Sequence, residues 1–335
     1  MSVERFQILS LDGGGIRGMY TAGVLAGLEG DLGTSLVDHF DMIVGTSTGG
    51  IIAIGLGLGI PVKQLLQLYR DKGSEIFPGG RRLRHWLRTK FDSAPLEKAL
   101  RDAFGERTLG DSRRALAIPY YDLRTSRPSM YKTQHHPDLM RDKDVLAWHA
   151  AMGTTAAPTY LPPSRHVAHS RHVDGGVWAN NPAMVGVLEA HSFLGVPLDR
   201  IRVLSLGTAN CVKEWPAKLD TGGKFRWAKA APELILRAQS DAAEEAVTLL
   251  LGKDRHLRVN PIVTESWNSL DKVQVDEFVS RAWSDSRAFG PRVRDAFLDH
   301  KAVNLEGARA MGAAQKAVEL EQARALGVAQ MEGAR

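Results

Sequence analysis

The chain has 335 residues, which allows one large α/β domain or two ordinary domains. Hydrophobic residues account for 44% and charged residues for 24%, as in a soluble globular protein with a substantial core. One cysteine, Cys211, excludes an intramolecular disulfide; the first residues lack the apolar segment of a signal peptide, and the longest apolar stretch is too short to span a bilayer. We therefore expect a cytoplasmic protein whose contact with any membrane is peripheral.

The net charge of +5 is mild, but basic residues are concentrated at residues 81–90, where they are mixed with apolar ones. The run follows a Pro-Gly-Gly sequence, so we expect residues 76–90 to form a mobile flap. A solvated helix face and a site for an anionic partner explain the run equally well. Among such partners, a membrane surface or a phosphorylated ligand is favoured over DNA because no nucleic-acid-binding motif accompanies the run.

Buried apolar runs and helical periodicity alternate along the first two thirds of the chain. The predicted strands lie, in chain order, at residues 6–11, 39–44, 115–122, 129–132, 166–173 and 201–208. The predicted helices begin near Met19, near Thr48, at Pro61 and at Pro95, and continue with residues 145–152 and 183–193. After residue 224 the chain is mostly helical, with a break at Pro232 and a late strand at 257–261. This alternation predicts an α/β protein, a three-layer α/β/α fold with a mainly parallel central sheet.

The second predicted strand leads into Gly45-Thr46-Ser47-Thr48-Gly49 and then into an apolar helix. A strand, a sharp turn and a helix around Gly-x-Ser-x-Gly are typical of a nucleophile elbow. Gly45 and Gly49 avoid side-chain collisions where the chain reverses, and Ser47 takes a strained conformation that projects its hydroxyl. The pentad alone is a weak pattern, because glycine-rich turns between strands and helices also occur for packing reasons.

A glycine-rich turn at residues 12–18, which begins at Asp12 and ends at Gly18, follows the first predicted strand. Such a turn brings backbone N–H groups close to an anion, either a phosphate or a transient oxyanion, and Arg17 adds a positive charge for either. Its spacing matches neither a dinucleotide-binding nor a nucleotide triphosphate-binding motif. The candidate oxyanion donors are Gly13, Gly14 and Gly15. A tight turn made only for packing is the alternative.

A second acidic turn, at Asp174 with Gly175 and Gly176, also follows a predicted strand. A serine hydroxyl needs a base within hydrogen-bonding reach, and histidine is the usual base. The histidines available for a triad after Ser47 are His191, His256 and His300. None of them lies in a glycine-rich turn at a strand end. A desolvated carboxylate can take the serine proton directly, so we predict a dyad of Ser47 and Asp174.

The Asp12 turn, Ser47 and Asp174 each follow a strand directly, and parallel sheets place their sites at the carboxyl ends of strands. We therefore expect the three to converge. Small residues and prolines at 153–163 predict a rigid loop, which either makes room for a ligand chain or forms a packing turn. No repeat or linker divides the chain, so we predict one domain at residues 1–315, with a motif-bearing core at 6–210 and a helical part at 224–315. An alanine-rich tail at 316–335 follows it.

Taken together and in this order, the motifs resemble those of the patatin-like phospholipases. They are Asp12-Gly13-Gly14-Gly15-Ile16-Arg17-Gly18, Gly45-Thr46-Ser47-Thr48-Gly49 and Asp174-Gly175-Gly176. An Ala-Ala-Pro-Thr-Tyr segment at 156–160 and the Asn-Pro pair at 181–182 fit the same family. The resemblance covers residues 6–210. It implies the patatin-like fold, Ser47 as nucleophile, Asp174 as base, an oxyanion hole in the first glycine turn, and lipid acyl hydrolysis without a metal or cofactor.

In length and layout the chain is also similar to the phospholipase effectors of bacterial antiphage defence (CBASS), which a cyclic oligonucleotide activates. That similarity implies a cyclic di- or trinucleotide activator, hydrolysis of acyl esters in membrane glycerophospholipids and peripheral association with the inner face of the membrane. It is compatible with an oligomer, and it assigns no residue to a nucleotide site. The alternative function is an anion- or nucleotide-binding regulatory protein that uses the glycine-rich turns without hydrolysis.

Overall fold

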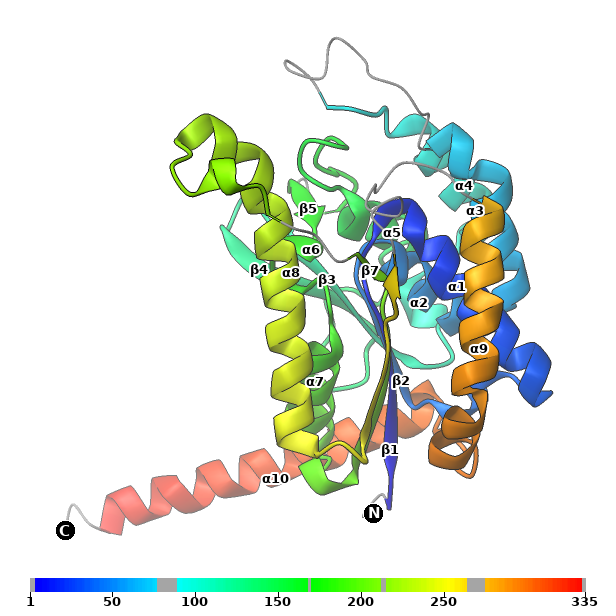
Figure 1. The fold of residues 1–335 in the computed structure, drawn as a ribbon. Coiled ribbons are helices and arrows are strands. Elements are labelled where there is room, and N and C mark those ends of the chain that lie inside the picture. The colour runs from blue at the N-terminus through cyan, green and yellow to red at the C-terminus, as the bar shows by residue number, and fades with distance from the viewer. Residues whose placement is uncertain (1–3, 77–88, 168–169, 212–214, 264–274, 333–335) are drawn as a thin grey trace.

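The computed structural model describes residues 4–76, 89–167, 170–211, 215–263 and 275–332 (Figure 1). Its centre is a seven-stranded sheet in the order β4-β3-β2-β1-β6-β8, with β5 paired to β3. The strands are β1 (Phe6–Leu11), β2 (Met42–Gly45), β3 (Ala115–Asp122), β4 (Arg127–Lys132), β5 (His172–Asp174), β6 (Ile201–Leu206) and β8 (His256–Val259). The pairs β1–β2, β1–β6, β2–β3 and β6–β8 are parallel, which confirms the mainly parallel sheet.

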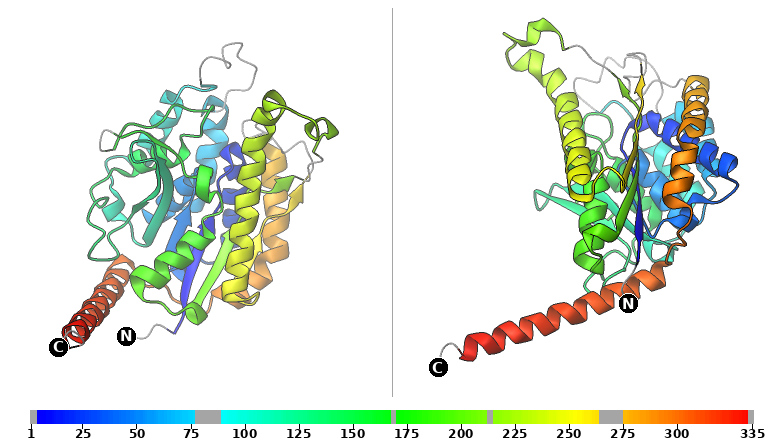
Figure 2. Two further views of the ribbon diagram at one scale, coloured as in Figure 1. Left: turned by 90° about the vertical axis from the view of Figure 1, so that its left-hand side faces the viewer. Right: turned by 60° about the horizontal axis from the view of Figure 1, so that its bottom comes forward.

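Helices cover both faces of the sheet (Figure 1). One face carries α1 (Gly18–Leu32), α2 (Thr48–Gly57), α3 (Val62–Ile76), α4 (Ala94–Phe104), α5 (Ala147–Thr155) and α9 (Val275–Phe297). The other face carries α6 (Gly176–Ala179), α7 (Ala183–Leu194), α8 (Lys224–Leu251) and the start of α10 (Leu305–Glu332). Figure 2 shows α10 extending away from the body of the molecule, near the end of the sheet at which the chain begins. The predicted three-layer α/β/α fold is confirmed.

The two layers of core follow from the alternation of side chains along the central strands. Leu9, Leu11 and Ile43 pack toward α1 and α2, whereas Ile8 and Met42 pack toward α7. Each of these side chains is fully buried. Because both faces of the sheet are covered, the central strands read as continuous apolar runs, which made them visible in the sequence.

Three local predictions need correction. β5 pairs with β3 in the antiparallel direction, so Asp174 does not end a parallel strand as predicted. α8 continues through Pro232, where we predicted a break. Pro232 is exposed, so water can solvate the carbonyl group that loses its helical partner. The second strand begins at Met42 rather than at residue 39, since a short 3-10 turn (Leu36–His39) precedes it.

Two other predictions stay predictions. Residues 77–88 are outside the described part of the chain, and they include most of the basic run at 81–90. The flap predicted at 76–90 therefore has no structural account. The division between the domain and the alanine-rich tail is likewise untested. α10 runs continuously across residue 315, with Glu306 in its first turn.

Candidate active site

Ser47 lies at the turn between β2 and α2, at the carboxyl end of the parallel strands. Its φ of 54° and ψ of −122° lie in a region that side chains with a Cβ rarely adopt, and they project the hydroxyl out of the turn. Gly45 and Gly49 allow this turn because a Cβ at Gly45 would overlap the carbonyl of Gly49, and a Cβ at Gly49 would overlap the carbonyl of Leu11. The predicted strand–turn–helix context is present.

The Ser47 hydroxyl donates a hydrogen bond of 2.7 Å to Oδ2 of Asp174. The other carboxylate oxygen, Oδ1, accepts the backbone N–H of Gly176 at 2.7 Å. Both side chains are buried, with Ser47 8% and Asp174 5% exposed. Burial raises the pKa of Asp174 to about 6, although the hydrogen bonds from Ser47 and Gly176 favour the ionised form. Asp174 is therefore mostly ionised near neutral pH and is a stronger base than an ordinary carboxylate.

The three histidines that were weighed as alternative bases are engaged elsewhere. Nδ1 of His191 lies 2.9 Å from the carbonyl oxygen of Val196. Nδ1 of His256 lies 2.8 Å from the hydroxyl of Thr248. His300 lies 2.8 Å from the Asp41 carboxylate. The contacts of these three rings are structural, and the described residues place Asp174 against the Ser47 hydroxyl.

The first glycine turn lies beside Ser47, since a Cβ added at Gly13 would come within 3.2 Å of the Ser47 Cβ. The N–H of Gly13 donates to the carbonyl oxygen of Asn180 at 3.0 Å, so it is not free for an oxyanion. Gly14 and Gly15 begin a short 3-10 turn (Gly15–Arg17), and no described residue accepts their N–H groups. The set of candidate oxyanion donors is thus narrowed from three glycines to Gly14 and Gly15.

The charged residues of the first turn hold it in place. Arg258, on β8, donates to Oδ1 of Asp12 at 2.9 Å and to Oδ2 at 2.5 Å. The same guanidinium lies 3.2 Å from the carboxylate of Glu244 on α8. Arg17 donates to the carbonyl oxygens of Gly14 at 3.4 Å and Ala209 at 3.2 Å. The charges of Asp12 and Arg17 therefore brace the turn.

The end of α5 supports both catalytic candidates. The Ser47 N–H donates to the hydroxyl of Thr154 at 3.0 Å, and that hydroxyl donates to the carbonyl of Pro119 at 2.6 Å. Two residues further on, the carbonyl of Ala156 accepts the N–H of Asp174 at 3.0 Å. The small-residue segment at 153–163 thus begins with residues that hydrogen-bond the backbones of Ser47 and Asp174. Thr154 was missed in the sequence because nothing in its motif distinguishes it from Thr155.

A cavity of about 550 Å³ lies near the end of β5, and its described lining includes chain neighbours of Asp174 but neither Asp174 nor Ser47. Most of its wall is apolar, and the chain that flanks the catalytic candidate, at Val173 and Val177, contributes to it. Its lining residues are Thr89, Tyr121, Leu123, Pro158, Thr159, Leu161, Pro163, Val173, Val177 and Trp178. Four residues of the segment 158–163 line this cavity, and the two roles predicted for the segment stay predictions.

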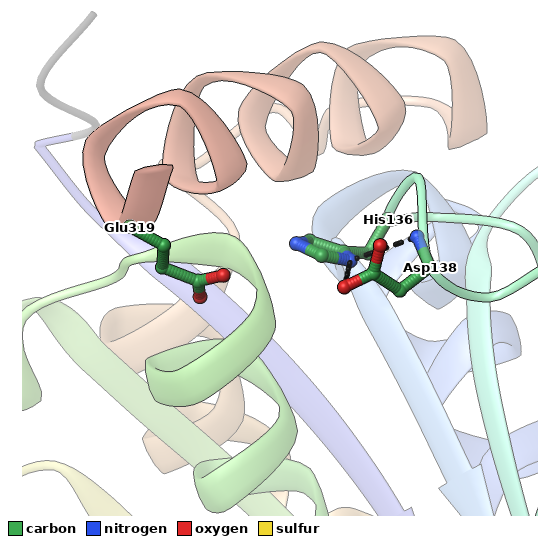
Figure 3. A group of neighbouring side chains, drawn as sticks. All are labelled: His136, Asp138 and Glu319. Atoms are coloured by element: carbon green, nitrogen blue, oxygen red, sulfur yellow. Dashed lines mark hydrogen bonds and ion pairs between the residues drawn. The ribbon is translucent and has the colours of Figure 1, made fainter. Parts of the chain in front are cut away.

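One group of side chains in the described part of the chain has the spacing of metal ligands, and Figure 3 shows it. It consists of His136 and Asp138, in the loop after β4, and Glu319 on α10. The ammonium of Lys316 already lies 2.6 Å from Asp138 and 3.7 Å from Glu319. α10 lies at the end of the sheet where β1 begins, whereas Ser47 follows the opposite ends of the strands (Figure 1). We assign this group to the docking of α10.

Comparison with known proteins identifies the family. The family described as patatin-like phospholipase matches residues 9–187, more than half of the chain. The chain belongs to the patatin-like phospholipase family. A protein named cGAMP-activated phospholipase from Pseudomonas aeruginosa is 35% identical over 284 residues, covering 82% of this chain and 84% of that protein. Another of the same name from Escherichia coli is 36% identical over 242 residues, covering 67% of each. The crystal structure of VipD from Legionella pneumophila has a TM-score of 0.46 and 14% identity, covering 88% of this chain and 67% of that chain.

As a patatin-like phospholipase, the chain is a hydrolase, and the matched residues contain both Ser47 and Asp174. No helix among the described residues is long and apolar enough to cross a membrane. The contacts made by Asn180, Gln239 and Arg258 were missed in the sequence, and the last two of these residues lie beyond the region that the family matches. Their signal was absent because their partners lie in distant turns, which no local motif records.

Proposed function

We propose that Ser47 and Asp174 form a catalytic dyad that hydrolyses acyl esters of membrane glycerophospholipids through an acyl-enzyme. The observation that carries this proposal is the 2.7 Å hydrogen bond from the Ser47 hydroxyl to a buried carboxylate at a nucleophile elbow. A carboxylate with a pKa near 6 is close enough to neutral pH to accept a proton and return it. Neither step needs a metal or a cofactor.

In the first half of the reaction, Oγ of Ser47 attacks the ester carbonyl carbon while its proton passes to Oδ2 of Asp174. The N–H groups of Gly14 and Gly15 stabilise the oxyanion that forms. Collapse of the tetrahedral intermediate breaks the ester bond, and Asp174 protonates the departing alkoxide. The lysophospholipid leaves, and the acyl group stays on Ser47.

In the second half, Asp174 takes a proton from water as the water oxygen attacks the acyl-enzyme carbonyl. The second tetrahedral intermediate collapses, Asp174 returns its proton to Ser47, and the fatty acid leaves. We place the acyl chain in the apolar cavity, because its lining residues Val173 and Val177 lie close to Asp174 along the chain. A fatty acyl chain makes no hydrogen bonds along its hydrocarbon part, so apolar walls suit it.

We further propose that a cyclic di- or trinucleotide activates the enzyme in bacterial antiphage defence. The support is the name cGAMP-activated phospholipase, borne by relatives in P. aeruginosa and E. coli that match most of this chain. The enzyme would act from the cytoplasm, associating peripherally with the inner face of the membrane through residues 81–90. Reversing the charges of that run should weaken binding to anionic vesicles, and unchanged binding would remove the run from the proposal.

The deciding experiment measures free fatty acid release from phospholipid vesicles, with and without cyclic GMP–AMP and a panel of other cyclic di- and trinucleotides. The wild type should release fatty acid, and the Ser47→Ala variant should release none while keeping its fold. Full activity in that variant would overturn the dyad. Thermal stabilisation by a nucleotide without hydrolysis or fluorophosphonate labelling of Ser47 would instead favour the anion-binding regulatory protein.

A further inference from the structure

We propose that Gln239, on α8, is a positioning residue that holds the base and the oxyanion turn in register with Ser47. Its side-chain amide bridges two points of the chain that follows Asp174. Nε2 of Gln239 donates to the carbonyl of Gly176 at 2.7 Å, and Oε1 accepts the N–H of Asn180 at 3.1 Å. The inference rests on the proposed function, because it assigns Gln239 a role through the dyad.

The first contact fixes the residue that hydrogen-bonds the base. Gly176 donates its N–H to Oδ1 of Asp174 at 2.7 Å while its carbonyl is held by Gln239. That N–H favours the ionised carboxylate and so limits how far burial raises the pKa of Asp174. Removing Gln239 would release the carbonyl of Gly176 and so loosen the residue whose N–H binds the carboxylate.

The second contact reaches the oxyanion turn through Asn180. Ser240, the next residue on α8, accepts the side-chain N–H of Asn180 at 3.1 Å, so α8 holds this residue by both backbone and side chain. The carbonyl of Asn180 in turn accepts the N–H of Gly13 at 3.0 Å. A Cβ at Gly13 would lie 2.5 Å from Oδ1 of Asn180 and 3.2 Å from Cβ of Ser47, so the glycine is enclosed between them.

Gln239 therefore takes part in two sets of hydrogen bonds. One set connects it through Gly176 to Asp174, and the other connects it through Asn180 and Gly13 to the turn with the candidate oxyanion donors. Proton transfer and oxyanion stabilisation both depend on sub-ångström placement of these groups. α8 lies outside the region that the family matches. The role proposed for Gln239 would therefore connect this part of the chain to the reaction.

The test compares Gln239→Met, which keeps the side-chain volume and loses both hydrogen bonds, with Gln239→Glu, which keeps the acceptor for Asn180. Glu245→Ala, at an exposed position on the same helix, is the matched control. Kinetics are measured on a soluble short-chain p-nitrophenyl ester from pH 5 to 9, with saturating cyclic GMP–AMP where the wild type requires it. Melting temperatures are recorded for every variant.

We expect Gln239→Met to lower kcat about tenfold with little change in KM, and to move the acid limb of the kcat profile to higher pH. Gln239→Glu should fall between it and the wild type, and Glu245→Ala should match the wild type. An unchanged kcat, or a lowered kcat with an unmoved acid limb, would overturn the positioning role. Activity that persists in Ser47→Ala would instead overturn the dyad itself, so the two failures are distinguishable.

Discussion

One Asp-Gly-Gly turn precedes Ser47 in the sequence and another follows it, and the aspartates of the two turns make different contacts. In the first turn, Arg258 occupies both carboxylate oxygens of Asp12. In the second, Asp174 faces a hydroxyl and a backbone N–H, and the causes that set its pKa include no charged partner. Both carboxylates are buried. In our proposal the partner, and not the motif, makes one aspartate a structural anion and the other the catalytic base.

The largest expected effect separates the two turns by activity. Asp174→Asn keeps the shape of the side chain and cannot accept a proton, so kcat should fall roughly 10³-fold. Asp12→Asn should cost far less activity per folded molecule, because Asp12 touches no reacting atom. Fatty acid release, normalised to the fraction folded by circular dichroism, measures both. Comparable losses in the two variants would contradict the assignment of roles.

The same pair of variants should change stability in opposite directions. Asp12→Asn leaves the buried guanidinium of Arg258 with Glu244 as its remaining charged partner and the Ser205 hydroxyl as a neutral one, which should lower the free energy of unfolding by about 3 kcal/mol. The pKa of Asp174 is raised to about 6 in the folded protein, above its ordinary value of 3.8. The stability that its protonated form contributes is full below pH 3.8 and is lost as the pH rises through 6.

Asparagine does not titrate, so Asp174→Asn should raise the unfolding free energy by about 2 kcal/mol at pH 8, and the gain should vanish toward pH 4. Denaturant titrations at the two pH values provide the measurement. A destabilised Asp174→Asn protein at pH 8 would show that the ionised carboxylate is better accommodated than its burial indicates. Asp174 would then resemble Asp12 in having an ionised carboxylate that the surrounding residues stabilise.

A third test uses the wild type alone. Since the ionised form of Asp174 is the base, kcat/KM should rise with pH through a limb near pH 6 and fall about tenfold for each unit below it. The measurement uses a soluble ester from pH 4.5 to 8, with the fold monitored at each point. A limb near pH 4 would indicate a carboxylate with an unperturbed pKa, and a limb near pH 7 would favour a histidine as the base.

Part of the fold and of the candidate site was predictable because the sequence patterns that indicate it are local. The buried strands and the elbow at Ser47 follow from apolar runs and glycine spacing, and the pairing of Ser47 with Asp174 followed from their expected places at strand ends and from the lack of a histidine at such a place. The antiparallel direction of β5 was not predictable, since three residues carry no signal of direction. The bond from Gly13 to Asn180 and the supports from Arg258 and Gln239 were hidden too. Each of them joins residues that lie far apart along the chain.

The smallest expected effect concerns Thr154, which links the second turn to the elbow. Its hydroxyl accepts the Ser47 N–H, and its carbonyl accepts the N–H of Gly175 at 3.3 Å. Thr154→Val keeps the shape but leaves the Ser47 N–H and the Pro119 carbonyl without this partner. We expect kcat to fall about fivefold and unfolding to become easier by about 1–2 kcal/mol. Thr154→Ser keeps the hydroxyl and should behave as the wild type. If Thr154→Val labels with a fluorophosphonate as fast as Thr154→Ser, the strained backbone at Ser47 is held by its glycines alone.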